Sequence, residues 1–265
     1  MRIPAHSIEG RTALVTGAGS GIGKATAKLL AQSGARVGLV SLTEEELEET
    51  RHEILKGGGE AFIAVADVSD PPAMERVLQQ IRDQWDRLDI VVANAGINGL
   101  WAPIEEIPPE EWDRTLAVNL RGTFLTVRAS LPLLKVRGGA VVIVSSVNGT
   151  RIFSNAGASA YAASKAGQAA FARMAALELA PHKIRVNTVC PGSIHTKIDD
   201  NTVRQDLEKI RPMVEFPQGN VPLTRGEPGT SGQVAELIWF LVSDASSHIT
   251  GAEVFIDGGE SLVQG

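Results

Sequence analysis

Short runs of apolar, often β-branched residues alternate along the chain with longer amphipathic segments. The runs that predict strands are Thr12–Thr16, Ala35–Val40, Ala61–Ala66, Ile90–Ala93, Ala140–Ser145, Arg185–Cys190 and Glu253–Ile256. Several are apolar throughout, which is typical of parallel strands covered on both faces. The helical patterns between them include Gly23–Gln32, Glu44–Leu55, Ala73–Trp85, Ala160–Ala180 and Gln233–Val242. This alternation predicts an α/β fold, a doubly wound parallel sheet of about seven strands with helices on both faces.

Local signals mark several helix ends. Thr43 with Glu46 has the spacing of a capping box, and Asp70 followed by Pro71 predicts an N-cap with proline at the first helical position. The triplet Gly57–Gly59 is expected to end a helix. The stretch Lys197–Thr230 departs from the pattern, with four prolines and mixed charges, and predicts a substrate loop or lid. We find no linker or repeat, so we expect one domain over residues 1–265.

Composition narrows the classes of function. The 265 residues are 43% hydrophobic and 21% charged, as in globular proteins, and the net charge of −6 argues against a nucleic-acid partner. No basic run suggests a membrane surface, and no apolar run approaches the ~20 residues of a spanning helix. The polar segment Met1–Arg11 lacks the apolar core of a signal peptide. Cys190 is the only cysteine, so no intramolecular disulfide is possible, and we expect a soluble, cytoplasmic protein with a small-molecule partner.

The first predicted strand ends in a glycine-rich loop that opens the first predicted helix. The loop comprises Thr16, Gly17, Ala18, Gly19, Ser20, Gly21, Ile22 and Gly23, with glycines spaced G-x-x-x-G-x-G. Such a loop lets a diphosphate approach the backbone, and the helix then presents free N–H groups and the positive end of its dipole. A tight strand–helix turn would explain the glycines alone. The second strand and the Ala66–Val68 end of the third follow in the order of a dinucleotide site, which favours the binding role.

Tyr161 and Lys165 stand four residues apart on an alanine-rich helix, so both side chains lie on one face. A free phenol has a pKa near 10, and a nearby ammonium would lower it. We therefore expect Tyr161 to titrate below a free phenol, with Lys165 as the cation. A surface Tyr/Lys pair on an amphipathic helix is the alternative when the pair is considered alone.

Further short motifs stand in the order found in one known family. They are the glycine loop, Asn94–Ala95–Gly96 after the fourth strand, Asn119 in a predicted helix, the Tyr161/Lys165 pair, Pro191–Gly192 with Ile194 and Thr196, and Ile249–Gly251 through Asp257–Gly259. From about Ile8 to Gly259, the chain resembles the short-chain dehydrogenases/reductases. The resemblance implies a Rossmann-like fold and an NAD(P)-dependent oxidoreductase that acts on the CH–OH or carbonyl group of a small molecule.

The resemblance also implies roles for individual residues. Tyr161 would exchange a proton with the substrate oxygen, Lys165 would lower the Tyr161 pKa and bind the ribose, and Asn119 would position a relay water. A serine normally stands about thirteen residues before the tyrosine, where this chain has Asn148. Alignment from the preceding strand gives Ser146, which we prefer because the following loop can absorb two extra residues. Asn148 and Ser145 remain the alternatives.

The cofactor is expected to be NAD, without excluding NADP. Ser41 stands where the family's ribose-binding aspartate would be, and Leu42 where NADP enzymes often carry arginine. Ser20 replaces another frequent basic residue, and Glu44–Glu46 adds negative charge. Asp67 could bind the adenine amine or only shape a turn at the strand end, with Val68 beside it.

Substrate recognition is predicted less sharply. The expected pocket residues are Asn98, Trp101, Asn148, Phe153 and His195, which suit a polyol, a sugar, a ring ketone or a 3-oxoacyl compound. No cluster has the spacing of a metal site. A dinucleotide-binding regulator and a nucleotide-sugar epimerase are the other candidate classes. The retained Tyr161/Lys165 pair argues against the first, and the short C-terminal part against the second. The resemblance implies a homotetramer or dimer, and Leu237–Val242 and Leu262–Val263, which have no obvious place in a monomer core, agree with it.

Overall fold

Seven parallel strands form the central sheet of the computed structural model, which describes residues 8–210 and 219–264. The strands are β1 (Thr12–Thr16), β2 (Arg36–Ser41), β3 (Glu60–Val65), β4 (Ile90–Ala93), β6 (Gly139–Val144), β7 (Ile184–Pro191) and β11 (Glu253–Ile256). Their order is β11-β7-β6-β4-β1-β2-β3, so the chain winds outward in both directions from β1 and β4. The predicted Rossmann-like fold is confirmed, with strand bounds within one residue of those expected.

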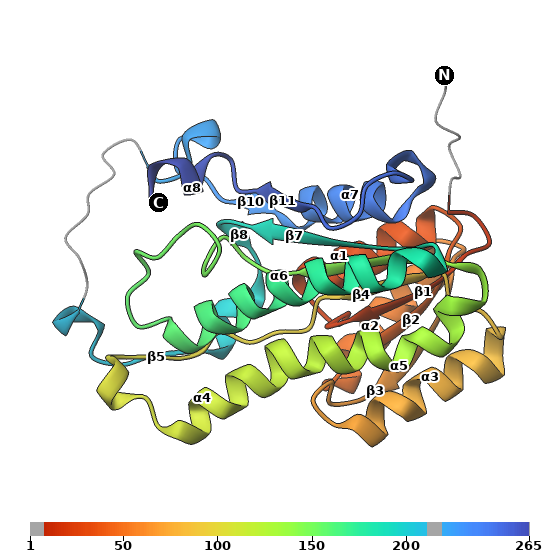
Figure 1. Cartoon of the computed structure of the whole chain (residues 1–265), viewed down its shortest axis with the longest axis horizontal. Helices are drawn as coiled ribbons and strands as arrows, with labels where there is room; N and C mark the ends of the chain where they lie inside the picture. The colour runs from red at the N-terminus through yellow and green to blue at the C-terminus, as the bar shows by residue number, and fades with distance from the viewer. Residues whose placement is uncertain (1–7, 211–218, 265) are drawn as a thin grey trace.

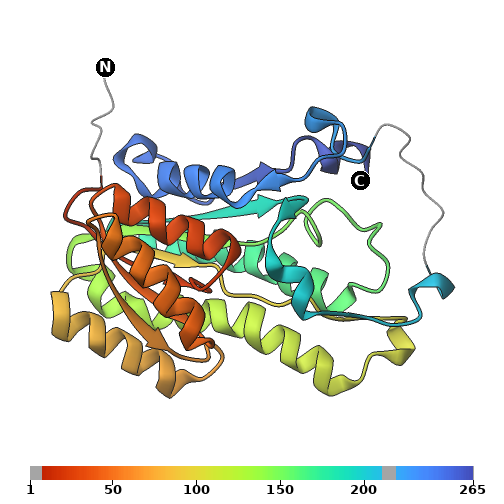
Figure 2. The same ribbon diagram turned by 180° about the vertical axis from the view of Figure 1, so that it is seen from behind.

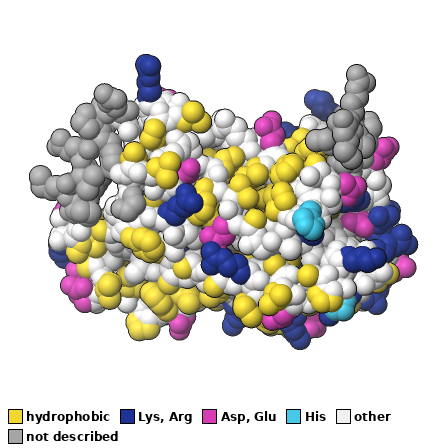
Figure 3. Space-filling model, turned by 45° about the horizontal axis from the view of Figure 1, so that its top comes forward, with side chains coloured by type: hydrophobic (Ala, Val, Ile, Leu, Met, Phe, Trp, Pro, Cys, Tyr) yellow, Lys and Arg dark blue, Asp and Glu magenta, His cyan; other side chains and the backbone are white. Residues whose placement is uncertain are grey.

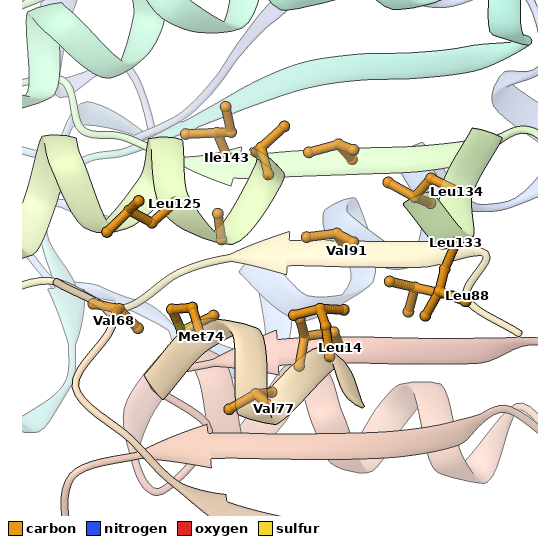
Figure 4. Packing of buried hydrophobic residues seen from close by; sticks show 14 of the residues in the cluster. Leu14, Val68, Met74, Val77, Leu88, Val91, Leu125, Leu133, Leu134 and Ile143 are labelled. Atoms are coloured by element: carbon orange, nitrogen blue, oxygen red, sulfur yellow. The ribbon is translucent and has the colours of Figure 1, made fainter. Parts of the chain in front are cut away.

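Helices cover both faces of the sheet (Figures 1 and 2). One layer contains α1 (Gly21–Gln32), α2 (Glu44–Lys56) and α7 (Ser231–Val242); the other contains α3 (Pro71–Trp85), α5 (Gly122–Arg137) and α6 (Ser159–Leu179). Alternate strand residues enter opposite cores: Val15 packs in the α1/α7 layer, whereas Leu14 and Val91 pack in the α3/α5 layer (Figure 4). Both faces are therefore apolar, which explains the uninterrupted hydrophobic runs.

The segment between β4 and β6 contains helices that the sequence pattern did not predict. These are α4 (Pro109–Leu116), a π-helical turn η2 (Ala117–Arg121) and α5. Helix α5 carries an internal Pro132 and buries polar residues such as Thr126 and Ser130, whose hydroxyls donate to backbone carbonyls four residues earlier. Polar residues on the buried side reduce the contrast between a hydrophobic and a polar face. The hydrophobic periodicity of the sequence therefore does not predict this helix.

The expected lid is tied to the body by two small parallel sheets. Strand β5 (Gly99–Trp101) pairs with β9 (Thr202–Arg204), and β8 (Ile194–His195) pairs with β10 (Gly229–Thr230). Short helical turns complete the chain at η1 (Ile104–Glu106), η3 (Ala180–His182), η4 (Lys197–Asn201), η5 (Leu207–Lys209), η6 (Pro222–Thr224), η7 (Asp244–Ser246) and α8 (Glu260–Val263). Residues 1–7 of the N-terminal segment, and Pro212 and Pro217 of the lid, lie outside the described residues.

Helix capping follows the predictions only in part. Asp70 is the N-cap of α3 with proline next to it, and Gly57 is the C-cap of α2, as expected. Thr43 is the N-cap of α2, but its side chain makes no capping hydrogen bond, so the predicted capping box is wrong. The Glu46 side chain instead packs against Gly19. A complete capping box occurs at α7, where Thr230 and Gln233 exchange hydrogen bonds.

Within residues 8–210 and 219–264, no helix combines the length and apolar character needed to cross a membrane.

Thr230→Ala should lower the free energy of unfolding by about 1 kcal/mol, because it removes the side-chain acceptor of the α7 capping box. Thr43→Ala is the matched control and should change stability much less, since its hydroxyl makes no cap bond. Urea unfolding followed by circular dichroism measures both. Equal losses in the two variants would contradict this account of the helix ends.

Candidate active site

A cleft opens where the winding of the sheet reverses. Because β1 and β4 are neighbours but their connections leave in opposite directions, the loops at their carboxyl ends diverge. The cleft between these loops has a volume of about 440 Å³. Its lining includes the expected residues Gly17, Ser20, Gly21, Ile22, Ser41, Leu42, Asp67, Val68, Asn94, Ala95, Gly96 and Thr196. The fold thus gathers side chains from six separate segments at one edge.

The glycine loop fits closely against the loop after β4. Gly17 has φ +66°, and a Cβ there would lie 2.8 Å from Asn94 Nδ2. A Cβ on Gly23 would lie 2.0 Å from the Gly17 carbonyl oxygen. Asn94 Nδ2 donates to the carbonyls of Thr16 and Gly17 at 3.0 and 3.3 Å. The start of α1 beside this cradle leaves backbone N–H groups for an anion, so the residues present fit a dinucleotide diphosphate.

The far end of the cleft carries the residues expected to select the cofactor. Ser41, Leu42 and Glu46 line it together, and Leu42 is 66% exposed. Asp67 shapes the turn after β3, since its Oδ1 accepts hydrogen bonds from the Ser69 N–H and hydroxyl, both at 2.8 Å. Asp67 also lines the cleft, so the turn role and the adenine-binding role are compatible.

Tyr161, Ser146 and Lys165 meet at the inner end of α6. The Ser146 side chain faces the Tyr161 hydroxyl and lowers the pKa of the phenol. Lys165 Nζ donates to the Val144 carbonyl at 3.0 Å and lies 5.5 Å from the centre of the Tyr161 ring. Ser145 has a different partner, the Lys165 carbonyl at 2.8 Å. The hydroxyl facing Tyr161 is therefore that of Ser146, the position obtained by alignment from the strand.

Burial dominates the titration of the pair. Desolvation raises the pKa of Tyr161 to about 12, although the Ser146 hydrogen bond acts in the opposite direction. Desolvation likewise lowers the pKa of Lys165 to about 8. The expected downward shift of the Tyr161 pKa is therefore wrong for this structure. An ammonium that is itself disfavoured by burial gives the phenolate too little compensation.

Asn119 lies in the π-helical turn and is fully buried. Its amide exchanges two hydrogen bonds with the Ile97 backbone, at 2.8 and 2.9 Å, and donates to Ser164 at 3.0 Å. The backbone carbonyl of Asn119 accepts hydrogen bonds from the Thr123 hydroxyl and the Gln168 side-chain amide, both at 2.7 Å. Asn119 thus holds the loop after Gly96 against α6. A Cβ on Gly96 would lie 3.4 Å from Lys165 Nζ, which puts the ammonium at the cleft wall.

The segment after β7 closes the cleft from the other side. Pro191 ends β7, Ile194 packs against the core, and Thr196 lies 3.4 Å from the position of a Cβ on Gly21. Gly192 is required because a Cβ there would lie 2.5 Å from a Glu260 carboxylate oxygen. The sequence reasoning missed Ser69, Ile97, Arg114, Val118, Ile198 and Asn201, which also line the cleft. Their position after strand ends or inside the unpredicted helices was the available signal.

The expected substrate residues separate into four groups. Asn98 anchors the lid, since its N–H donates to Asn201 and its Nδ2 to Thr202. Trp101 lies over Tyr161, with ring centres 6.4 Å apart. Asn148 and Phe153 line a separate cavity of about 380 Å³ whose other walls are mostly apolar, with Ala102, Ile104, Ile152, Ala156 and Ile210. His195 is exposed in β8 at the base of the lid, and Ser231 donates to its carbonyl.

No group of three or more His, Cys, Asp or Glu in the described part of the chain is arranged to hold a metal ion. Cys190 is buried, and burial raises the pKa of its thiol to about 12.

Tyr161, the only tyrosine, should ionise near pH 12 in the protein without cofactor, because burial disfavours the phenolate. The folded pKa lies above the unfolded value of about 10, so this group should cost stability between pH 10 and 12. Tyrosinate absorbance measures the ionisation, with Tyr161→Phe as the blank. Adding oxidised NAD, whose ring is positive, should lower the midpoint. A midpoint at or below 10 without cofactor would show that Lys165 outweighs burial.

Comparisons with known proteins agree with this geometry. A family model described as "Enoyl-(Acyl carrier protein) reductase" matches residues 17–261. Levodione reductase of Leifsonia aquatica is 36% identical over 263 residues, which span 97% of each chain. The 3-oxoacyl-(acyl-carrier-protein) reductase of Thermotoga maritima is 39% identical over 253 residues, 95% of this chain and 98% of the relative.

A solved structure is similar over the same range. The crystal structure of a 3-ketoacyl-ACP reductase from Sinorhizobium meliloti gives a TM-score of 0.93 at 54% identity, covering 95% of this chain and 99% of that one. Family model, relatives and fold therefore converge: the chain belongs to the short-chain dehydrogenases/reductases, oxidoreductases that use a nicotinamide dinucleotide to interconvert alcohols and carbonyls.

Proposed function

We propose that this protein interconverts a ring ketone and its alcohol, with Tyr161 as the general acid/base. The observation that carries the proposal is that Ser146 faces the Tyr161 phenol and lowers its pKa, while Lys165 Nζ lies 5.5 Å from the centre of the same ring. Two hydroxyls that meet at one point can hold one substrate oxygen between them. Bound nicotinamide would supply or accept the hydride.

Each side chain has a separate task in this mechanism. Ser146 donates to the substrate oxygen and so orients the carbonyl, while the Tyr161 hydroxyl transfers the proton. Lys165 binds the ribose and favours loss of the phenol proton once an opposite charge offsets its burial. Asn119 fixes the backbone at Ile97, and a water relay beside it remains part of the proposal. Trp101, on the strand that pairs with β9 of the lid, lies beside the Tyr161 ring and would contact a substrate bound there.

The apolar cavity beside Asn148 and Phe153 favours an alicyclic substrate over a polyol or sugar. The name of the levodione reductase relative, a protein of similar length, supports the same class. A 3-oxoacyl thioester is the second candidate, supported by the name of the 54% identical structure. A panel of cyclic ketones and alcohols beside an acetoacetyl thioester, read by reduced-nicotinamide absorbance, distinguishes the two.

We propose a homotetramer in the cytoplasm, with the whole chain as one catalytic domain and residues 197–230 as the lid. Exposed apolar side chains support the assembly: Phe124 and Val136 on α5, Met174 and Leu177 on α6, Phe240 on α7, and Leu262 and Val263 on α8. The expectation that Leu237–Val242 lacks a place in the monomer core is wrong, because Ile238, Leu241 and Val242 pack against the sheet and leave only Phe240 exposed. Figure 3, in which the face with α7 and α8 is turned toward the viewer, shows apolar side chains gathered there. Two separate apolar faces suit an assembly with two kinds of two-fold interface. The lone cysteine fits a reducing compartment.

Lys165→Met should lower turnover about a hundredfold or more, because it removes the cation beside Tyr161 and the ribose contact. Its stability should not fall, since the pKa of about 8 shows that burial disfavours the ammonium. The wild type should gain stability relative to the variant as pH rises from 8 to about 10.5, where the unfolded lysine loses its proton. Initial rates and pH-dependent melting measure both effects.

Serine variants are the control for this assignment. Ser146→Ala should lower the rate at least tenfold. Ser145→Ala should keep most of the wild-type rate, because the Ser145 hydroxyl donates to the Lys165 carbonyl and does not face Tyr161. Near-full activity of Lys165→Met and Ser146→Ala would remove the mechanism.

NAD should be preferred over NADP, and Leu42→Arg should improve NADP binding about tenfold by pairing a guanidinium with the 2′-phosphate. Leu42 and Glu46 line the same end of the cleft, which at present offers a carboxylate rather than a cation. Leu55→Arg is the matched control, because Leu55 is exposed on α2, the helix that follows Leu42, and does not line the cleft. Fluorescence titration gives the dissociation constants. A tenfold NADPH preference in the unmodified protein would contradict this assignment.

A further inference from the structure

Glu260 is a buried carboxylate at the start of α8 for which the mechanism above has no task. It is 7% exposed, and desolvation, followed by the charge of Asp257, raises its pKa. Asp257 turns the chain so that Glu260 faces inward, since its two carboxylate oxygens accept from the Gly259 and Ser261 N–H groups. Burying a carboxylate costs free energy unless hydrogen bonds compensate. The groups that donate to Glu260 therefore indicate which segments it holds in place.

The partners of Glu260 belong to three different segments. Oε2 accepts from the Ser193 N–H at 2.6 Å, while Oε1 accepts from Asn220 Nδ2 at 3.0 Å and from Gln264 Nε2 at 3.1 Å. Ser193 belongs to the segment that closes the cleft, Asn220 to the lid, and Gln264 to the C-terminus. A single side chain therefore connects the lid with the wall of the cofactor cleft.

The Ser193 arm reaches the cleft through short, rigid connections. Ser193 follows Gly192, whose missing Cβ leaves room for Glu260 Oε2, and Thr196 three residues later faces Gly21 of the glycine loop. The Ser193 carbonyl also accepts from the Gly229 N–H at 2.9 Å, where the lid returns to the body. A shift of the Ser193 backbone would therefore change the position of Thr196 relative to Gly21 of the glycine loop.

The lid arm is equally well defined. The Leu223 N–H donates to the Gly258 carbonyl at 3.0 Å, and a Cβ on Gly258 would lie 2.6 Å from Val221, which is buried. In both ribbon views α8 lies beside the segment that precedes α7 (Figures 1 and 2). Opening this half of the lid would take Asn220 away from Glu260 and leave a buried charge with one donor fewer.

We propose that Glu260 is a positioning residue that couples the lid to the cleft wall: the Ser193–Thr196 segment keeps its cleft-closing conformation through the Glu260 carboxylate, which is held in turn by Asn220 of the lid. The proposal rests on the proposed function, because it assigns residues 197–230 as the lid and the cleft as the dinucleotide site. It predicts that a change at Asn220 reaches Ser193 through the Glu260 carboxylate, beside the backbone pairing of β10 with β8 that a change at Asn220 leaves in place.

The first test uses hydrogen exchange of the full-length protein without cofactor, together with NADH titration. Glu260→Ala should accelerate amide exchange across Ser193–Thr196 and raise the NADH dissociation constant on the order of tenfold, the effect of losing a hydrogen bond to a charged group. Glu260→Gln should stay within about threefold of the wild type, because the amide oxygen can still accept from Ser193 and the Asn220 amide can rotate. Gln264→Ala, which removes only the C-terminal arm, is the matched control and should stay near wild type.

The second test is a double-mutant cycle. Asn220→Ala should accelerate exchange in Ser193–Thr196 as well as in the lid, and it should add nothing to Glu260→Ala. Additive effects, or a loosened lid with unchanged Ser193–Thr196 exchange, would overturn the coupling. If Glu260→Ala does not fold, Glu260→Gln and Asn220→Ala still decide the question. A wild type that binds neither NADH nor NADPH would refute the proposed function, whereas unchanged NADH binding by a folded Glu260→Ala would refute this inference alone.

Discussion

The contact between the ends of β1 and β4 determines the geometry of the whole site. The Thr16 hydroxyl accepts the Asn94 and Ala95 N–H groups at 3.0 and 3.1 Å, and the Asn94 amide returns two hydrogen bonds to Thr16 and Gly17. Because Gly17 and Gly23 lack Cβ atoms, the two loops approach within van der Waals contact and then diverge. The cleft is the space that this divergence opens, and every cofactor-binding role assigned above depends on it.

The catalytic pair depends on a second constraint, its exclusion from water. Burial opposes ionisation of both Tyr161 and Lys165, so each remains closer to its neutral form than it would in solvent. The same exclusion strengthens any charge–charge interaction that a bound cofactor or a developing oxyanion introduces. A bound charge would therefore change the ionisation of Tyr161 and Lys165. Without a ligand, Ser146 already lowers the Tyr161 pKa, although by less than burial raises it.

The elements around this buried pair come from parts of the chain that are far apart in the sequence. Strand β9, in the first part of the proposed lid, pairs with β5. Trp101 of β5 lies beside Tyr161. The last part rests on the turn after β11, where the C-terminal Glu260 reaches back to Ser193. The proposed lid, the cleft wall and the C-terminal turn thus form one connected region.

The sequence by itself determined the parts that depend on local pattern. The seven strands, five helices, the glycine loop and the pairing of Tyr161 with Lys165 on one helix face all follow from periodicity and spacing over a few residues. The choice of Ser146 came from the family resemblance, aligned from a well-defined strand and not across the variable loop. Helix α5 escaped prediction because its buried face carries Thr126 and Ser130, whose polarity is satisfied within the helix itself.

Only the tertiary structure decided the properties that depend on what surrounds each group. Thr43 and Glu46 have the right spacing for a cap, yet Glu46 packs against Gly19 instead. The Tyr161 pKa moves upward because desolvation, which no sequence spacing reports, exceeds the opposing effect of Ser146. Asn98 anchors the lid, and Glu260 joins segments 40 and 67 residues away. Periodicity encodes which face a residue occupies, whereas burial and long-range partners arise only when the faces are assembled.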